Sequence, residues 1–515
     1  MVWYGGDMIA AEMVRRGAER YAARTAVVFG DERMSFSEVD DAANRFANAL
    51  MARGLSKGDQ VALLVNNGPW SVSLDFACLK AGFVRVPLNA RLSVLEHERM
   101  LRETEARWLV YGSALAEVAS SLCERVPGLV GIGIGNADVG GGDLLADAAT
   151  ADDRDPGVEL SADDPMLVLY TSGTTGTLKA AVHTQGSYAA IATNILANLV
   201  SPQRDSVMLH AASLIHASGT FVLPYWLAGA TTAILERFEP TEFVAAIARY
   251  RATEVNLVPT MLAMLFASGA AEHADVSSLR TVIYGASPMP RPVLERAIDA
   301  WGPIFTQYYG QTEAPLCITV LDRADHLDAS LRGSCGFPSV DAEVRLVTED
   351  GGLAGVGEIG EVQVRAPFVM AGYYRADELN AEMMTDGWLR TRDMARRDER
   401  GYLYLVDRRS DMIVTGGYNV YPREVEDALM EHPAVAECAV VAAPDPTWVE
   451  AVVAFVVFKP DGAASEEELR AFVRDRLAGY KVPQRVTVLE QIPKSAVGKV
   501  LRRALRDPLW GDGRG

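Results

Sequence analysis

The sequence predicts an α/β protein with a large N-terminal domain of parallel-rich sheets covered by helices (residues 1–407) and a small α+β C-terminal domain (residues 408–515). The chain has 515 residues, and at roughly 150 residues per domain this length allows two to four domains. Helix and strand patterns alternate along the N-terminal part, as they do in parallel sheets with helices on both faces. After residue 407 the pattern changes to short strands and two helices, which indicates a separate module.

The N-terminal alternation begins with Phe36–Leu50, where apolar residues recur at helical spacing. Ser37 is the expected N-cap of this helix, since a serine hydroxyl can accept hydrogen bonds from the first free N–H groups. Residues 60–65 and 83–87 are expected to form buried strands, with a helix at 70–81 between them. This order of elements favours a parallel sheet.

The segment GIGIGNADVGGGD, residues 131–143, looks at first like a dinucleotide-binding glycine loop. Asn136 stands where the third glycine of that motif belongs, and no amphipathic helix follows. We therefore expect a surface loop here and no dinucleotide site.

The net charge is −19, from 49 Lys and Arg against 68 Asp and Glu. Such an acidic chain is not expected to bind nucleic acid or an anionic membrane surface. Five widely spaced cysteines fit neither a disulfide framework nor a zinc site. Since the N-terminus has no signal-peptide pattern and no apolar run is long enough to span a bilayer, we expect a cytoplasmic protein.

The charge is unevenly distributed along the chain. Residues 408–515 hold 15 basic and 16 acidic residues, a balance of −1, which leaves −18 for residues 1–407. Seven Lys and Arg lie between Lys481 and Arg506, with Glu490 as the single acid in that segment. This run is either a solvated basic surface, the usual case, or an element that faces a small polyphosphate.

A phosphate-binding loop is predicted at Thr171–Lys179. The apolar run Leu167–Tyr170 indicates a buried strand, and TSGTTGTLK follows it directly. Glycines let backbone N–H groups approach an anion, hydroxyls donate to it, and Lys179 adds a positive charge. The spacing differs from a Walker A loop, which places lysine directly after the second glycine.

YTSGTTGTLK resembles the signature loop of the adenylate-forming superfamily, which contains acyl- and aryl-CoA synthetases, peptide-synthetase adenylation domains and luciferases. The resemblance implies ATP, Mg²⁺ and coenzyme A as ligands, and a mobile C-terminal domain. The chain departs from the common loop at Leu178 and Ala180. The resemblance assigns nucleotide binding to seven residues of the loop, of which Thr175 also faces the metal: Thr171, Ser172, Gly173, Thr174, Thr175, Gly176 and Lys179.

A second motif, YGQTE at residues 309–313, is similar to the family's adenine- and magnesium-binding segment. The resemblance implies that Tyr309 stacks on the base beside Gly310, that Thr312 contacts the α-phosphate and that Glu313 holds Mg²⁺. A carboxylate beside phosphate oxygens is a common Mg²⁺ ligand. Ala286, in YGASP, corresponds to the segment that flanks adenine.

Residues 386–393, DGWLRTRD, resemble the family's ribose-binding segment, in which Asp393 accepts both ribose hydroxyls. Relatives usually have glycine before this aspartate, whereas this chain has Arg392. Arg408 corresponds to a second ribose- or phosphate-facing group. The hinge between domains, commonly Asp or Lys in relatives, is expected at Ser410.

The C-terminal segment Pro493–Arg503 resembles the part of the family that carries its catalytic lysine. The resemblance therefore identifies Lys499, with Thr312 and Glu313, as catalytic residues. A lysine is a point charge that can neutralise the transition state while pyrophosphate leaves.

The acid-binding pocket is inferred from motif positions alone, and an aryl or an acyl group fits the mixture of aromatic and small residues equally well. Its expected members are Tyr188, His216, Ala217, Ser218, Tyr284, Gly285 and Tyr308.

These motifs predict an AMP-forming acyl-CoA synthetase that activates a carboxylic acid as an acyl-adenylate and transfers it to coenzyme A. A homodimer is the default expectation for its oligomeric state. An alternative is delivery of the activated acid to a carrier protein or an amine, or activation of nitrite for diazotisation. A non-catalytic nucleotide-binding regulator is a third hypothesis, which the presence of Lys499, Glu313 and Asp393 disfavours.

Overall fold

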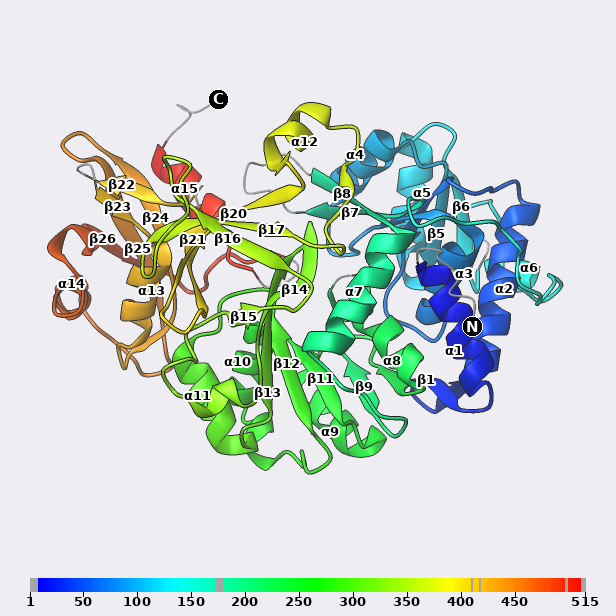
Figure 1. Ribbon diagram of the computed structural model, residues 1–515, viewed down its shortest axis with the longest axis horizontal. Helices are drawn as coiled ribbons and strands as arrows, with labels where there is room; N and C mark the ends of the chain where they lie inside the picture. The colour runs from blue at the N-terminus through cyan, green and yellow to red at the C-terminus, as the bar shows by residue number, and fades with distance from the viewer. Residues whose placement is uncertain are drawn as a thin grey trace.

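The computed structural model describes residues 8–136, 138–171, 179–215, 217–408, 411–415, 418–495 and 499–510. Two large sheets form the N-terminal part (Figure 1). The first is nine-stranded, and its strands β1, β9, β10, β11, β12 and β13 pair in parallel. Its order is β15 (Phe337–Pro338), β14 (Ala314–Leu321), β13 (Phe305–Gln311), β12 (Thr281–Gly285), β11 (Glu254–Leu257), β9 (Val207–His210), β10 (Thr231–Ile234), β1 (Thr25–Phe29) and β2 (Glu32–Ser35).

The second sheet is seven-stranded, with a parallel part from β7 to β6 and antiparallel β8 and β18 at one edge. Its order is β18 (Gly372–Tyr373), β8 (Lys179–Thr184), β7 (Pro165–Thr171), β4 (Val84–Pro87), β3 (Gln60–Leu64), β5 (Trp108–Gly112) and β6 (Val130–Ile134).

Two smaller sheets follow in the chain. One is antiparallel and contains β16 (Glu343–Val347), β17 (Ile359–Arg365), β19 (Met384–Thr385), β20 (Trp388–Arg397) and β21 (Leu403–Arg408). The other belongs to the C-terminal part and contains β22 (Ile413–Thr415), β23 (Tyr418–Val420), β24 (Val435–Asp445), β25 (Val449–Phe458) and β26 (Arg485–Val488). It is accompanied by α13 (Pro422–Met430), α14 (Glu466–Arg474) and α15 (Arg502–Trp510).

Helices cover both faces of both large sheets. The layer between the sheets contains α1 (Ala10–Tyr21), α2 (Phe36–Ala52), α3 (Ser71–Ala81), α7 (Gln185–Asn198) and α8 (Val222–Ala228). The outer face of the nine-stranded sheet packs on α9 (Pro240–Tyr250), α10 (Pro259–Ala267) and α11 (Arg291–Trp301). The outer face of the seven-stranded sheet packs on α4 (Val94–Thr104) and α5 (Ala116–Arg125). Two short helices, α6 (Leu144–Ala148) and α12 (Asp377–Met383), also belong to the N-terminal part.

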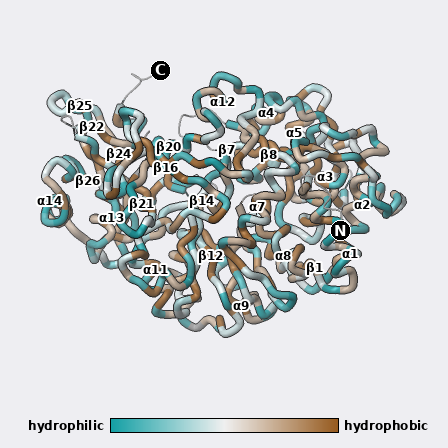
Figure 2. The backbone as a smooth tube through the Cα atoms, in the orientation of Figure 1, coloured by the Kyte–Doolittle hydropathy of each residue, from teal (hydrophilic) through white to brown (hydrophobic). Residues whose placement is uncertain are grey.

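The predicted fold class is confirmed by these layers. Apolar residues concentrate along the inner strands and hydrophilic residues on the outer loops (Figure 2), as expected for parallel strands buried on both faces. The strands predicted at 60–65 and 83–87 are β3 and β4, and the helix predicted at 70–81 is α3. The predicted domain boundary after residue 407 lies within β21, one residue before its end, and the division into domains stays a prediction.

Two local predictions were wrong. The N-cap of α2 is Ser35, not Ser37: the Ser35 hydroxyl accepts from the Glu38 N–H at 3.2 Å, and the Glu38 carboxylate accepts from the Ser35 N–H at 2.7 Å. This reciprocal capping box provides hydrogen-bond acceptors for two backbone N–H groups at the start of the helix. The Ser37 hydroxyl instead donates to the Ala22 carbonyl.

The start of the glycine-rich segment is strand β6 rather than a surface loop. It pairs in parallel with β5 at the edge of the seven-stranded sheet. Because glycine carries no side chain, the alternation of apolar and polar residues that marks a strand was not visible in the sequence.

Candidate active site

The predicted phosphate loop joins β7 to β8. These strands are antiparallel, and Thr171 and Lys179 are register partners at the base of the hairpin. Ser172, Gly173, Thr174, Thr175, Gly176 and Leu178 lie outside the described residues, as does the side chain of Thr171. The structure therefore describes the base of the loop and its lysine, Lys179.

Lys179 and Glu313 both contact Tyr373. The Lys179 Nζ atom lies 5.6 Å from the centre of the Tyr373 ring, a distance at which a cation is attracted to an aromatic face. The Tyr373 hydroxyl donates to Glu313 Oε1 at 2.6 Å. One tyrosine on β18 therefore links the lysine of the phosphate loop to the predicted magnesium ligand, although 60 residues separate the tyrosine from the glutamate in sequence.

The YGQTE turn connects β13 to β14, and Gly310 is required there. A Cβ atom at Gly310 would lie 2.6 Å from the Leu316 backbone nitrogen and 2.7 Å from the Ala314 oxygen. The Glu313 carbonyl accepts from the Met370 N–H at 2.8 Å, and the Glu313 side chain is buried. The turn is thus fixed through its backbone, which leaves the Thr312 and Glu313 side chains for other contacts.

His183 on β8 supports the same turn. Its Nε2 donates to the Thr312 carbonyl at 2.8 Å, and its Nδ1 lies 3.4 Å from the Ser187 hydroxyl. Burial lowers the pKa of His183 to about 4, so the ring is neutral at physiological pH. Sequence reasoning missed both His183 and Tyr373, because neither lies in a recognisable motif.

The predicted ribose and adenine residues contact each other. The Tyr309 hydroxyl donates to Asp393 Oδ2 at 2.7 Å. Burial, together with the neighbouring Asp393 carboxylate, raises the pKa of Tyr309 well above its usual value, so the hydroxyl remains a donor. Asp393 on β20 is the register partner of Arg408 on β21, whose side chain lies outside the described part. The roles of these residues stay predictions.

The residue before Asp393 has the backbone conformation that glycine favours. Arg392 has φ +61°, in the left-handed region that side chains disfavour. Its guanidinium pairs with Glu382 at 2.7 Å, and its N–H donates to Glu361 at 3.2 Å. The arginine therefore holds a backbone conformation that glycine adopts without steric cost. Ala286 is also left-handed, with φ +67°.

The residues predicted to line the acid pocket are distributed over both faces of the nine-stranded sheet. A Cβ atom at Gly285 would lie 2.7 Å from the Tyr308 ring, and the Ser218 hydroxyl lies 2.9 Å from Nδ1 of His210. Ala217 and Ser218 belong to the short helix η2 (Ala217–Phe221). His216 lies outside the described residues.

Tyr284 packs in the outer cluster of the sheet, with its hydroxyl 2.9 Å from Nε2 of His326. Tyr188 lies in the layer between the large sheets, where the Arg85 guanidinium sits 5.4 Å from its ring centre. The two tyrosines are therefore in different layers, and their predicted place in one pocket stays a prediction.

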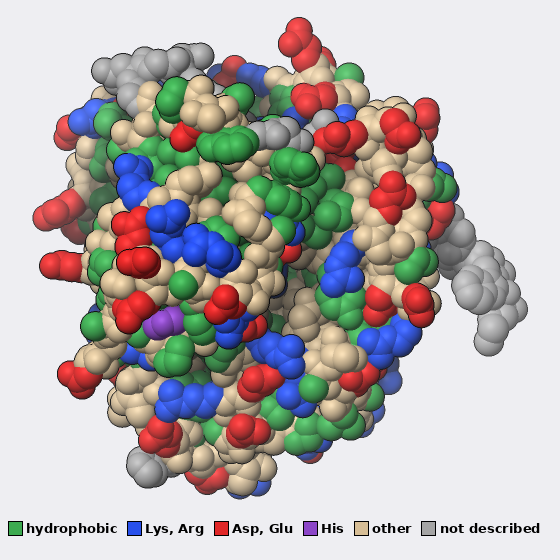
Figure 3. Space-filling model, turned by 90° about the vertical axis from the view of Figure 1, so that its left-hand side faces the viewer, with side chains coloured by type: hydrophobic (Ala, Val, Ile, Leu, Met, Phe, Trp, Pro, Cys, Tyr) green, Lys and Arg blue, Asp and Glu red, His purple; other side chains and the backbone are tan. Residues whose placement is uncertain are grey.

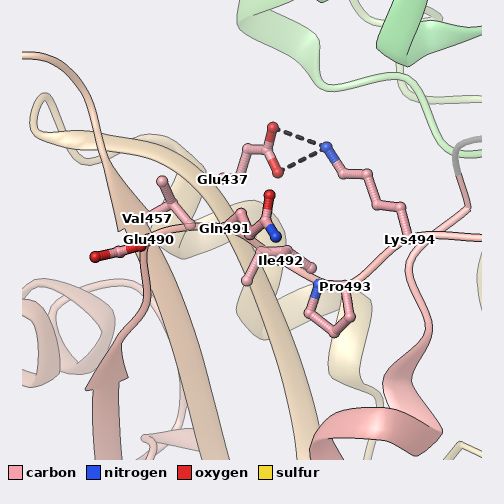
Figure 4. Close-up of a pocket in the computed structure, with 7 residues that line it drawn as sticks. All are labelled: Glu437, Val457, Glu490, Gln491, Ile492, Pro493 and Lys494. Carbon is pink, nitrogen blue, oxygen red and sulfur yellow. Dashed lines mark hydrogen bonds and ion pairs between the residues drawn. The ribbon is translucent and has the colours of Figure 1, made fainter.

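Lys499 lies in the C-terminal part and is exposed. The Ser495 N–H donates to the Lys499 carbonyl at 2.7 Å, and the Lys499 N–H donates to the Ser495 hydroxyl at 3.2 Å. Just before this turn, the Lys494 ammonium pairs with Glu437 on β24 at 2.7 Å, beside Pro493 and Ile492 (Figure 4). Residues 496–498, and the predicted hinge at Ser410, lie outside the described residues.

Much of the basic run is paired within the C-terminal part. Lys481 bonds Glu424 at 2.6 Å, and Arg502 bonds Glu426 at 2.7 Å and Asp411 at 3.2 Å. On the face drawn in Figure 3, blue side chains have red neighbours. These basic side chains therefore stabilise the small module instead of forming one basic surface.

In the part of the chain that the structure describes, no group of three His, Cys, Asp or Glu side chains could hold a metal ion. A single buried carboxylate, Glu313, fits Mg²⁺, which commonly binds through one carboxylate and substrate phosphates. No helix among the described residues is long and apolar enough to cross a membrane.

Residues 14–374 match the sequence family described as AMP-binding enzyme, and residues 424–499 match the AMP-binding enzyme C-terminal domain. The chain is 39% identical over 490 residues to a feruloyl-CoA synthase of Amycolatopsis sp, covering 94% of this chain and 95% of the relative. It is 36% identical over 515 residues to a medium/long-chain-fatty-acid–CoA ligase of Mycobacterium tuberculosis, covering 96% and 89%.

Among solved structures, the amide bond synthetase McbA from Marinactinospora thermotolerans is similar, with a TM-score of 0.89 and 32% identity. The match covers 97% of this chain and 99% of that one. The likeness therefore extends over both parts of the molecule.

Proposed function

The chain belongs to the AMP-binding, adenylate-forming enzyme family, and from this premise we propose that it is an AMP-forming acyl-CoA synthetase. The observation that carries the proposal is the Lys179–Tyr373–Glu313 contact. It brings together the lysine on β8 of the seven-stranded sheet and the predicted magnesium ligand in the turn after β13 of the nine-stranded sheet. CoA ligases among the relatives support coenzyme A as the acceptor.

In the first half-reaction the substrate carboxylate attacks the α-phosphorus of ATP, the bond to the β-phosphate breaks, and pyrophosphate leaves. The protein supplies no nucleophile, so positioning and charge neutralisation carry the catalysis. Lys179 and Lys499 would bind phosphate oxygens, Thr312 would donate to the α-phosphate, and Glu313 with Thr175 would hold Mg²⁺. Bound Mg²⁺ would neutralise phosphate charge.

In the second half-reaction the thiolate of coenzyme A attacks the acyl carbon, and AMP leaves with the bonding electron pair. Asp393 and Tyr309 would hold the nucleotide through both steps. The C-terminal domain would rotate between the steps about the segment near Ser410. We place the enzyme in the cytoplasm and propose a homodimer, the most common oligomeric state.

The test is ATP–pyrophosphate exchange with a panel of carboxylic acids, in wild type and Lys499→Ala. We expect the exchange rate of the variant to fall by about a hundredfold or more, because the substitution removes a positive charge that stabilises the transition state. The matched control is Lys459→Ala. Lys459 follows β25 directly, and its ammonium donates to the Pro433 carbonyl. Wild-type exchange in Lys499→Ala would refute the catalytic role of this lysine, and no exchange with any acid would refute the proposed function.

A second candidate acceptor is an amine, which the likeness to an amide bond synthetase favours. The first half-reaction is the same, and the acceptor alone differs. Product analysis with equal concentrations of coenzyme A and a primary amine separates the two. A thioester supports the main proposal, and an amide formed in preference supports the second.

A further inference from the structure

Tyr373 contacts Lys179 and Glu313, the two charged side chains that the proposed mechanism assigns to ATP and its metal ion. No motif gives the tyrosine a role of its own. Its hydroxyl donates to Glu313 Oε1 at 2.6 Å, and its ring centre lies 5.6 Å from the Lys179 Nζ atom. Tyr373 is 4% exposed and Glu313 is 8% exposed. The hydrogen bond is therefore largely out of water, where electrostatic interactions are strong.

The backbone of Tyr373 is held from both sides. Strand β18 lies between β8 and α12, which are neighbours in Figure 1. On the β8 side, Tyr373 is the antiparallel register partner of Ala181. On the α12 side, the Tyr373 N–H donates to Asn380 Oδ1 at 2.6 Å, and Asn380 Nδ2 donates to the Tyr373 carbonyl at 2.9 Å. The Asn380 amide thus takes the place of a neighbouring strand, and the phenol is carried on a fixed backbone.

The same segment also holds Glu313 at a second point. The Met370 N–H, three residues before the tyrosine, donates to the Glu313 carbonyl at 2.8 Å. Residues 370–373 therefore fix both the backbone of Glu313 and one oxygen of its carboxylate. With the backbone fixed, the phenol sets how the carboxylate is turned.

This arrangement suits a metal ligand. The 2.6 Å separation between phenol and carboxylate is in the range of charge-assisted O–H···O⁻ bonds, which are stronger than neutral ones. Mg²⁺ demands near-ideal octahedral geometry, so a carboxylate that is already oriented binds it better than one that turns freely. Carboxylates that ligate metals are themselves hydrogen-bonded, and loss of such a partner typically weakens metal binding by about 10–100-fold.

We propose that Tyr373 is a positioning residue for Mg²⁺: its hydroxyl orients the Glu313 carboxylate, and so sets how strongly the metal ion promotes ATP binding. The proposal rests on the proposed function, in which Glu313 holds Mg²⁺ beside the phosphates of ATP. The contact between the aromatic ring and Lys179 is separable from this role, because phenylalanine at residue 373 keeps it.

The experiment measures ATP binding to the acid-free protein by calorimetric titration, once with saturating Mg²⁺ and once with a chelator in its place. The dissociation constant without Mg²⁺ divided by the constant with Mg²⁺ is here named the metal coupling ratio. It reports the binding free energy shared between metal and nucleotide. The measurement requires no turnover, so it does not depend on which acid the enzyme activates.

Tyr373→Phe removes the hydroxyl and keeps the ring. We expect a metal coupling ratio of about 100 in wild type, within the usual range of such couplings, and a ratio about tenfold or more lower in the variant. ATP binding without Mg²⁺ should stay close to wild type, because Lys179 keeps its ring contact. A purely structural role would instead weaken ATP binding with and without Mg²⁺ alike, and leave the ratio unchanged.

Tyr374→Phe is the matched control, since it makes the same substitution at the next residue. Tyr374 accepts from the Gln60 amide at 2.8 Å, and successive side chains of an extended segment point to opposite faces. We expect this variant to keep the wild-type metal coupling ratio.

Two further variants test the route through Glu313. Glu313→Gln should lower the ratio by itself, and adding Tyr373→Phe to it should change the ratio by less than about twofold, because residues that act through one another are not additive. Tyr373→Leu leaves room for a water molecule beside the carboxylate, so it replaces the phenylalanine variant if that one fails to fold. It should lower the ratio equally and also weaken ATP binding without Mg²⁺.

A wild-type ratio near one, an unchanged ratio in the Tyr373 variants, or a further tenfold drop in the double variant would each overturn the proposal while the proposed function stands. If no acid supports pyrophosphate exchange but the ratio falls as expected, the proposed function fails and the inference about Tyr373 holds. If ATP does not bind under either condition, both fail.

Discussion

Arg392 takes a left-handed backbone conformation directly before Asp393. For a residue with a side chain this conformation costs about 1–2 kcal/mol. The guanidinium pairs with Glu382, but both side chains are partly exposed, and such surface pairs contribute little. Strained residues are found at binding sites where the surrounding structure holds them, and here the Glu361 carboxylate accepts from the Arg392 N–H.

We expect Arg392→Gly to be more stable than Arg392→Ala by about 1 kcal/mol, although glycine normally costs stability relative to alanine. Both variants lose the ion pair with Glu382, so the difference between their free energies of unfolding reports the backbone strain alone. Urea unfolding of the two proteins measures it. If the alanine variant were as stable as the glycine variant, the left-handed conformation at residue 392 would carry no strain.

At the scale of elements, a buried lysine joins three helices. Lys80 on α3 is 1% exposed. Its ammonium lies 2.7 Å from Asp40 on α2 and 3.2 Å from Asp155. Asp155 in turn bonds Arg15 on α1 at 2.8 Å. The layer between the large sheets is therefore held by charge as well as by apolar packing.

Lys80→Met should destabilise the protein by about 3 kcal/mol, because removing one member of a buried ion pair leaves the other uncompensated. Adding Asp40→Asn should recover part of the loss, since it removes one of the carboxylates left unpaired. Urea unfolding of wild type, single and double variants gives the comparison. A double variant less stable than the single one would argue against the ion pair.

The sequence predicted many elements but not all. Helix α2 was predicted from its apolar spacing and strand β3 from its buried run, because side-chain periodicity reports burial. The cap at Ser35 was missed by two residues, since several serines compete and only three-dimensional geometry selects one. Strand β6 was missed because glycine has no side chain to alternate.

The whole molecule places the candidate site where three sheets meet. Lys179 and Tyr373 come from the seven-stranded sheet, Tyr309 and Glu313 from the nine-stranded sheet and the turn after β13, and Asp393 from the antiparallel sheet. The predicted nucleotide contacts therefore depend on the relative positions of whole layers.

Stability is expected to fall as the pH falls below about 6.5. Unfolded histidines bind protons near that pH, whereas buried His183 stays neutral down to its pKa of about 4. Between these values the unfolded state binds more protons, so the free energy of unfolding rises with pH and is lost as the pH drops. His183 alone contributes about 3 kcal/mol over this range.

The variant His183→Gln keeps a donor for the Thr312 carbonyl without a group that titrates. We expect its unfolding free energy to change less between pH 7 and about 4.5 than that of wild type. Urea unfolding at several pH values provides the slopes. Identical slopes would contradict the role of His183.

The sequence by itself determined the family, because loop, turn and lysine motifs lie in a fixed order and each carries its own residue types. It also determined the alternation of helices and strands, because the spacing of apolar residues differs between the two. The tertiary structure alone decided which distant residues meet: Tyr373 with Glu313, and Tyr309 with Asp393. Such contacts follow from the register and packing of whole sheets, which no local pattern of residues encodes.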